Sequence, residues 1–329
     1  MSYSPGALAG TAIGCAFAGA AIASVIFFFF YRQKPTYQRQ PIDHSRYIDR
    51  RQQSPELFDY QFTPRSKIVL DQLPQAGSTD HSNLKEAFSL LETRIENFVY
   101  NYIHERPIAA ETVDTNKLHG VLGNGADDWS SFQWSTHLSG TTNRAAMLKY
   151  YIARVLCARI DPKGDPEKTL LPVDVLRLYQ TTLLGNTNNR TQQLVDYWRI
   201  ISAALLKQQY PLDTLGERDP RFDNINKTCA ELLGSLRPFL NQRSSEQISH
   251  SLRETVENFA KEGYRYFFQT NLTHIVWPPH SSTQVVLFPK LVSDFFTTAG
   301  PTKDEVVKVT IKDVSIEPLY DANSEPLKD

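Results

Sequence analysis

The stretch Asn83–His104, NLKEAFSLLETRIENFVYNYIH, decides the fold class of this 329-residue chain. Its apolar residues recur three and four positions apart, which places them on one face of an α-helix. That face comprises Leu84, Ala87, Phe88, Leu91, Ile95, Phe98, Val99, Tyr102 and Ile103. The sequence therefore predicts a long amphipathic helix that ends before Pro107, since proline cannot continue a helix.

Helical spacing recurs along most of the chain that follows. It marks the ranges 148–156, 172–183, 194–205, 229–240 and 252–267, the last with Ser244 or Ser245 as its N-cap. We therefore predict a mainly α fold, with an α-helical bundle domain over residues 83–275.

The last part of the chain reads as strand. Residues 283–288 and 306–311 are rich in valine, and the second run alternates a dry face of Val307, Val309 and Ile311 with a wet face of Lys308, Thr310 and Lys312. Because two strands alone are marginal, we expect a small β appendage over residues 276–315 that packs on the helices. A tail follows at 316–329.

The range 6–31 contains no charged residue. As a helix, Gly6–Phe30 would extend about 37 Å at about 1.5 Å per residue, enough to cross a hydrocarbon core of about 30 Å. A signal peptide would be shorter and would follow a basic region, which residues 1–5 lack. The sequence predicts a retained transmembrane helix.

Basic residues behind this segment predict its orientation in the lipid bilayer. Arg32, Lys34 and Arg39 lead the flank, and positive flanks stay in the cytosol. Residues 1–5 would then be lumenal or external and residues 32–329 cytosolic, in a membrane that the sequence does not specify. Gly6, Gly10 and Gly14 share one helix face, which favours self-association if they are not simply the small residues common in such helices.

Residues 32–82 read as a Pro/Gln-rich, basic tether, because prolines interrupt any helical period. Within this tether, Ser54 follows Arg50-Arg51 and precedes Pro55, a pattern typical of a kinase site that also arises by chance.

Recognisable catalytic motifs are missing from the sequence, and the eight histidines have no metal-ligand spacing. We therefore predict no catalytic residues, no metal and no cofactor, and whether the chain is an enzyme stays open. The net charge of −1 gives the whole chain no electrostatic footprint for nucleic acid.

One stretch, 120–140, reads as a long aromatic loop between two helices. Its candidate pocket or interaction residues are Asp127, Asp128, Trp129, Trp134 and His137. Such a loop can form a lid or binding surface. Alternatively, its tryptophans plug the helical bundle and have a structural role only.

The cysteines and the N-glycosylation sequons each allow two interpretations, which depend on the compartment of the domain. Cys157 and Cys229 are expected to be reduced core thiols, with a single disulfide between them as the alternative in an oxidising compartment. Asn189, Asn226 and Asn271 begin sequons, which carry glycans only if the domain is lumenal.

Leu91–Tyr102 and Val285–Val292, together with the Gly/Ala-rich apolar segment and the tether, resemble a group of uncharacterised single-pass membrane proteins of filamentous fungi. That group has no assigned activity, so the resemblance implies an architecture and no site.

The sequence favours a membrane-anchored helical scaffold or adaptor that faces the cytosol and binds other proteins, whose identity it does not reveal. One alternative is a membrane-tethered enzyme or ligand-binding domain with its pocket near the 120–140 loop. A second alternative is a glycosylated lumenal domain.

Overall fold

The computed structural model describes residues 81–123, 129–183, 195, 198–202, 205–206, 209–210, 214–216, 219–269, 272–279, 281, 283–298, 304–321 and 325–326. All of these residues belong to one compact unit. The predicted transmembrane helix at 6–31 lies outside them, as does the tether up to residue 80. Among the described residues, no helix combines the length and apolar character needed to cross a membrane.

Helices make up most of the described chain. They are α3 (His81–Tyr102), α4 (Thr115–Leu122), α5 (Ser131–Ser139), α6 (Arg144–Ile160), α7 (Val173–Leu183), α9 (Phe222–Leu236) and α10 (Ser245–Phe267), with short 3₁₀ turns η2 (Ala110–Thr112) and η3 (Arg237–Phe239). The predicted mainly α class is confirmed, and each helical range predicted from spacing overlaps a helix, although 194–205 is described only in part. The predicted range 229–240 extends beyond α9, which ends at Leu236, into η3.

The long helices α3, α6 and α10 pack on one another at the centre of the bundle, and α9 packs on α10. The predicted apolar face of α3 is buried at Leu84, Phe88, Leu91, Ile95, Phe98 and Val99. Ser244 caps α10, as predicted, by accepting a hydrogen bond from the Gln247 amide at 3.2 Å.

Two hydrophobic clusters form the interior. The first core joins α3, α4, α5, α6, α9 and α10 to the sheet, whereas the second core gathers α7, the end of α10 and residues near 195 and 210. The helices α6 and α10 approach closely where the clusters meet, because a Cβ added to Gly263 would lie 2.5 Å from Ile160 Cγ2. Glycine is therefore required at this crossing.

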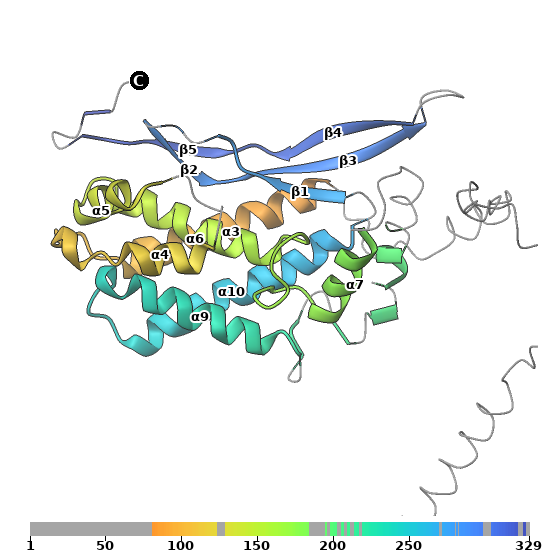
Figure 1. Cartoon of the computed structure of the whole chain (residues 1–329), viewed down its shortest axis with the longest axis horizontal. Helices are drawn as coiled ribbons and strands as arrows, with labels where there is room; N and C mark the ends of the chain where they lie inside the picture. The colour runs from red at the N-terminus through yellow and green to blue at the C-terminus, as the bar shows by residue number, and fades with distance from the viewer. Residues whose placement is uncertain are drawn as a thin grey trace, which may run out of the picture. The chain divides into compact units, whose positions relative to one another are not determined.

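The strands form a layer over one face of the helices (Figure 1). One antiparallel sheet has the order β1-β3-β4, and a second pairs β2 with β5. The strands are β1 (Leu272–Val276), β2 (Gln284–Phe288), β3 (Lys290–Thr298), β4 (Asp304–Lys312) and β5 (Ser315–Pro318). The two predicted strands are confirmed as β2 and β4, and the other three were not predicted.

Lys312 corrects the predicted wet face of β4. Its side chain is buried, and its ammonium pairs with Glu92 of α3 while lying 5.0 Å from the centre of the Phe288 ring. An irregularity in the β3–β4 register at Leu291 and Val292 ends the alternation, so Ile311 and Lys312 are both buried. Lys308 and Thr310 are exposed, as predicted.

Candidate functional site

The predicted loop at 120–140 is wrong, because most of it is helical. The helix α4 continues to Leu122, and α5 begins at Ser131. The sequence signal for α5 is a capping box, in which Ser130 accepts from the Gln133 amide while the Gln133 side chain accepts from the Ser130 amide. Periodicity missed it because the helix spans little more than two turns.

Both tryptophans of this stretch are buried in the first core. Trp134 is fully buried, and its ring lies 6.0 Å from those of Tyr150 and Tyr151 on α6. Trp129 is 4% exposed and meets the His137 ring edge-on at 5.4 Å. Neither tryptophan borders the groove described below. These positions favour the structural alternative for both residues.

The remaining candidate residues of the 120–140 stretch are two aspartates and one histidine. Asp127 and Asp128 lie outside the described residues. His137 Nδ1 lies 3.2 Å from Asn143 Nδ2, and burial lowers the pKa of its imidazole, so the ring accepts from the amide in its neutral form. Asn143 also exchanges hydrogen bonds with the backbone of Tyr320 at 2.7 and 2.9 Å. His137 thus helps to fix a C-terminal segment on the bundle.

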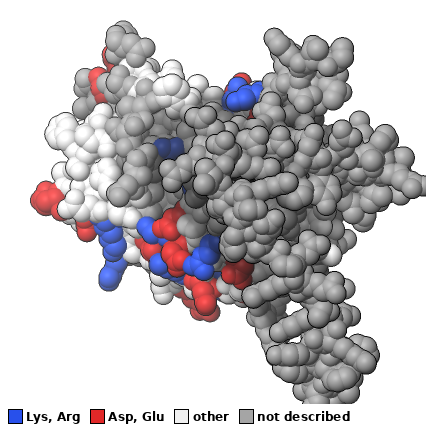
Figure 2. Space-filling view, turned by 45° about the vertical axis from the view of Figure 1, so that its right-hand side comes forward, with Lys and Arg blue, Asp and Glu red and all other residues white. Residues whose placement is uncertain are grey.

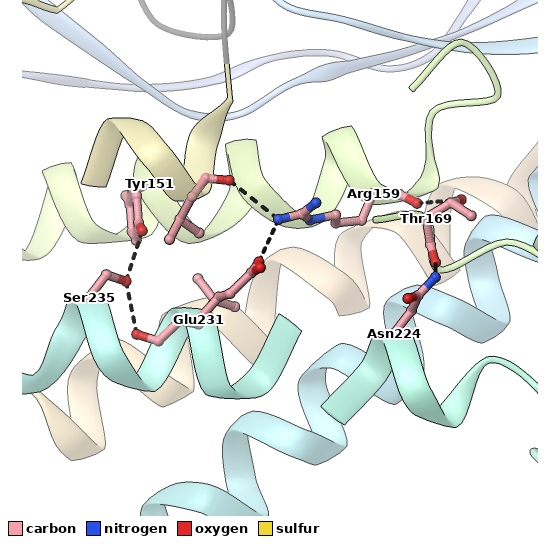
Figure 3. A network of polar contacts seen from close by, with 8 residues as sticks. Tyr151, Arg159, Thr169, Asn224, Glu231 and Ser235 are labelled. Carbon is pink, nitrogen blue, oxygen red and sulfur yellow. Dashed lines mark hydrogen bonds and ion pairs between the residues drawn. The ribbon is translucent and has the colours of Figure 1, made fainter. Parts of the chain in front are cut away.

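Figure 3 shows a polar network between α4, α6 and α9. Arg159 donates from Nη2 to Glu231 Oε2 at 2.8 Å, with the Val121 carbonyl oxygen at 3.4 Å. The Tyr151 hydroxyl donates to Ser235 Oγ at 2.8 Å, and burial raises the pKa of this phenol, so it stays protonated. The polar groups of Arg159 and Tyr151 bond to residues of α4 and α9, so the network connects these helices to α6.

The same network continues past the end of α6. Thr169 donates from its hydroxyl to the Arg159 carbonyl at 3.1 Å, and Asn224 donates to the Thr169 carbonyl at 2.8 Å (Figure 3). Residues far apart in the sequence supply these contacts, so spacing along the chain could not reveal them. The groove described below does not border the network.

A groove of about 620 Å³ lies between the C-terminal half of α3 and the start of α6. We call it the α3–α6 groove. Its lining comprises Glu96, Asn97, Val99, Tyr100, Ile103, His104, Glu105, Thr141, Thr142, Arg144, Ala145 and Lys149. Its volume is within the range of about 300–1,000 Å³ that is usual for binding sites. This groove is the candidate functional site, and no sequence motif indicated it.

Arg144 fixes one wall of the α3–α6 groove. Its buried guanidinium donates to the carbonyls of His104 and Arg106 at 2.9 and 2.7 Å, and to those of Leu138 and Ser139 at 2.8 Å. Burial lowers the pKa of this side chain. Because these bonds join the segment after α3 to the end of α5, the wall is already formed.

The exposed lining of the groove includes one aromatic ring and one carboxylate among smaller polar side chains. Tyr100 is 88% exposed although its neighbour Val99 is buried. Lys149 pairs with Glu96 at 3.8 Å, whereas Glu105 is exposed and makes no ion pair among the described residues. An apolar anchor next to an unpaired carboxylate can bind a protein segment that carries apolar and basic side chains.

One further face of the described residues carries charged side chains of both signs. Figure 2 shows acidic and basic side chains interspersed on one face of the described residues, without a patch of one sign there. Within the described part of the chain, no three or more His, Cys, Asp or Glu side chains gather as a metal site.

Cys157 and Cys229 are both free and buried, which confirms the predicted core thiols. Burial raises the pKa of the Cys157 thiol, and it raises that of Cys229 to about 11.

Because the thiolate is the reactive form of cysteine, we expect iodoacetamide to spare Cys157 and Cys229 in the folded chain at about pH 8 and to modify both in guanidinium chloride. Peptide mass spectrometry measures the extent of alkylation at each cysteine separately. A disulfide between them would instead prevent alkylation of both cysteines in guanidinium chloride until a reductant is added. That result would contradict the assignment of Cys157 and Cys229 as free thiols.

Of the predicted glycosylation, membrane and phosphorylation residues, one asparagine lies in the described part of the chain. Asn226 is exposed on α9, where its side-chain oxygen accepts from Arg253 at 2.7 Å, and Thr228 of the same sequon is buried. The residues outside the described part of the chain are Gly6, Gly10, Gly14, Arg32, Lys34, Arg39, Ser54, Asn189 and Asn271.

No protein-family model, curated protein or solved structure matches this chain. The contacts described above are therefore the basis for any assignment of function.

Proposed function

We propose that the chain is a membrane-anchored helical scaffold that holds a partner protein in the α3–α6 groove on the cytosolic side. The observation that carries this proposal is Tyr100, which is 88% exposed at the edge of a groove with a fixed wall. Aromatic side chains are enriched at protein interfaces because they bury a large area with little loss of conformational freedom. The α3–α6 groove accordingly serves as a docking surface.

The charges of the groove define the partner. Arg144 is buried and donates to backbone carbonyls, and Lys149 is paired with Glu96, so Glu105 is the exposed charged side chain of the lining that can meet a ligand. We infer a partner segment with an apolar side chain for Tyr100 and a Lys or Arg for Glu105. Anchoring by residues 6–31, with Arg32, Lys34 and Arg39 on the cytosolic side, is the part of the proposal that rests on sequence.

Photo-cross-linking in native membranes tests the docking surface. A photoreactive phenylalanine replaces Tyr100 in the full-length chain, and in a matched control it replaces Phe132, which is 79% exposed on α5 outside the groove. We expect position 100 to cross-link to one defined partner segment with a neighbouring basic residue, and position 132 not to do so. Glu105→Lys should remove the cross-link, and a charge reversal of the partner's basic residue should restore it.

Several outcomes would overturn this proposal. Equal labelling from positions 100 and 132 would show that the groove selects nothing. A cross-link to a second copy of the chain would replace adaptor function with self-association. A mass shift after glycosidase treatment, lost when Asn226 is changed to Gln, would move the domain to the lumen.

A further inference from the structure

A short segment behind β5 lies against the helical bundle. We call residues 319–321, together with Glu325 and Pro326, the C-terminal strap. Leu319 is fully buried in the first core, and its amide donates to the Thr283 carbonyl at 2.8 Å. Asp321 donates from its amide to the Glu325 carbonyl at 2.8 Å and accepts from the Glu325 amide at 2.9 Å, so the strap folds back on itself.

Asn143, the residue before α6, binds the strap through a paired contact. Its Nδ2 donates to the Tyr320 carbonyl at 2.7 Å, and its Oδ1 accepts from the Tyr320 amide at 2.9 Å. A carbonyl oxygen can only accept and a backbone amide can only donate, so these two bonds fix which end of the Asn143 side chain is the nitrogen. Turning the side-chain amide over would lose both bonds.

His137, in the last turn of α5, meets the nitrogen end of the Asn143 amide. Its Nδ1 lies 3.2 Å from Asn143 Nδ2. Because Nδ2 can only donate, Nδ1 has to accept, and the ring proton of the neutral imidazole is then on Nε2. A second proton on Nδ1 would place two donors against each other without an acceptor. The contact is therefore compatible with the neutral ring and incompatible with the imidazolium.

The surroundings of His137 also disfavour its charged form. Burial lowers the pKa of the imidazole, and the Trp129 ring meets it edge-on at 5.4 Å. Arg144, next to Asn143 in the chain, is a buried cation, which opposes a second positive charge nearby. Asp321 of the strap has the opposite sign, and its carboxylate accepts from a backbone amide within the strap.

Other elements that pack on α5 carry further titratable side chains. On η2, α4 and the rest of the first half of α6 they are Glu111, Lys117, His119, Lys149, Tyr150 and Tyr151. The lowered pKa of His137 comes from burial rather than from one of these charges. The geometry of the contact and the burial of the ring therefore act in the same direction.

Protonation of His137 can be accommodated if the Asn143 amide turns over. Asn143 Oδ1 then faces the Nδ1–H of the imidazolium and accepts a charge-assisted hydrogen bond. The same rotation places Nδ2 against the amide of Tyr320 and Oδ1 against its carbonyl. Both bonds to the strap are lost in exchange for one bond to the ring.

We propose that the C-terminal strap is a pH-sensitive latch, held closed by the bonds between Asn143 and Tyr320 while His137 is neutral and released when His137 is protonated. The closed strap keeps the pKa of His137 below the ordinary value of histidine, about 6.5. The closed form is therefore fully favoured above that pH and becomes less favoured as the pH falls below it. None of these three residues lines the α3–α6 groove, so the proposal does not rest on the scaffold function.

Hydrogen exchange of the Tyr320 amide, measured on the full-length chain in one detergent, tests the latch. After correction for intrinsic exchange, we expect its protection factor to fall below about pH 6.5 by up to about tenfold per pH unit, the limit for one proton. The Ile248 amide, which donates to the Ser244 carbonyl at 3.2 Å in α10, should keep its protection down to about pH 5. It reports that the bundle stays folded.

Two histidine variants form a matched pair for this experiment. In His137→Asn, a side-chain oxygen can accept from Asn143 but does not titrate, so the protection of Tyr320 should no longer depend on pH. His250→Asn, at an exposed position of α10, should keep the wild-type response.

Three results would overturn the latch. Unchanged protection of Tyr320 in the wild-type chain down to about pH 5 would show that the ring moves and the strap stays. An acid loss in His137→Asn equal to that of the wild type would assign the titration to another group. A parallel loss of protection at Ile248 would show that acid unfolds the bundle as a whole.

Discussion

Replacing Trp134 with alanine is expected to lower the free energy of unfolding by about 3–5 kcal/mol. The indole is fully buried and contacts the rings of Tyr150 and Tyr151, so its removal leaves a void that packed helices cannot fill. Urea unfolding of the purified wild-type and variant chains measures the difference. The same experiment tests the structural role assigned to this residue against the pocket role that the sequence also allowed.

Phe132 offers the matched control for this prediction. It lies on the same helix, α5, but its side chain is 79% exposed, so Phe132→Ala should change the free energy of unfolding by less than about 0.5 kcal/mol. A loss below about 1 kcal/mol for Trp134→Ala would mean that the surrounding helices adapt to the empty space. The indole would then not be a rigid part of the core.

Replacing Asp219 with alanine is expected to cost about 3–5 kcal/mol, because it leaves a buried guanidinium without its counter-ion. Arg221 donates to Asp219 from Nε and Nη2 at 2.9 and 2.7 Å, and both residues are at most 4% exposed. The rings of Tyr210 and Tyr264 lie within 5.5 Å of the guanidinium carbon and exclude water. Thermal and urea unfolding of the variant provide the measurement.

Two comparisons separate this charge effect from simple truncation. Glu167→Ala removes one partner of the exposed pair with Arg177, and should cost at most about 1 kcal/mol. The double variant Asp219→Leu with Arg221→Met removes both charges, and should recover much of the stability lost in Asp219→Ala. If the double variant is as unstable as the single one, packing rather than the unpaired charge carries the effect.

Local sequence signals predicted the local structure. The spacing of Leu84, Phe88, Leu91 and Ile95 indicated α3, because its buried face is set by residues a few positions apart. The short helix α5 was missed because its evidence lies in the cap formed by Ser130 and Gln133 rather than in a period. Lys312 was assigned to solvent because strand alternation does not reveal a register irregularity.

The candidate sites depend on contacts that spacing cannot reveal. The wall of the α3–α6 groove requires Arg144 to reach the carbonyl of His104, which lies 40 positions earlier. A second, smaller cavity of about 140 Å³ brings together Ile160, Tyr179, Tyr266 and Leu291 from four different elements. Neither site carries a recognisable motif, so both became visible only once the helices and the sheet were placed against one another.

The pairing of α3 with the sheet has a consequence for how the chain is made. Phe88 packs on Phe288 with ring centres 4.7 Å apart, and Glu92 meets Lys312, which is 220 positions later. At about 5–20 residues per second, a ribosome needs on the order of 10–40 s to synthesise the intervening chain. The helices α6 and α10 can cover part of the apolar face of α3 as they emerge, whereas the surface around Phe88 and Glu92 has no sheet to pack on until the last strands are made.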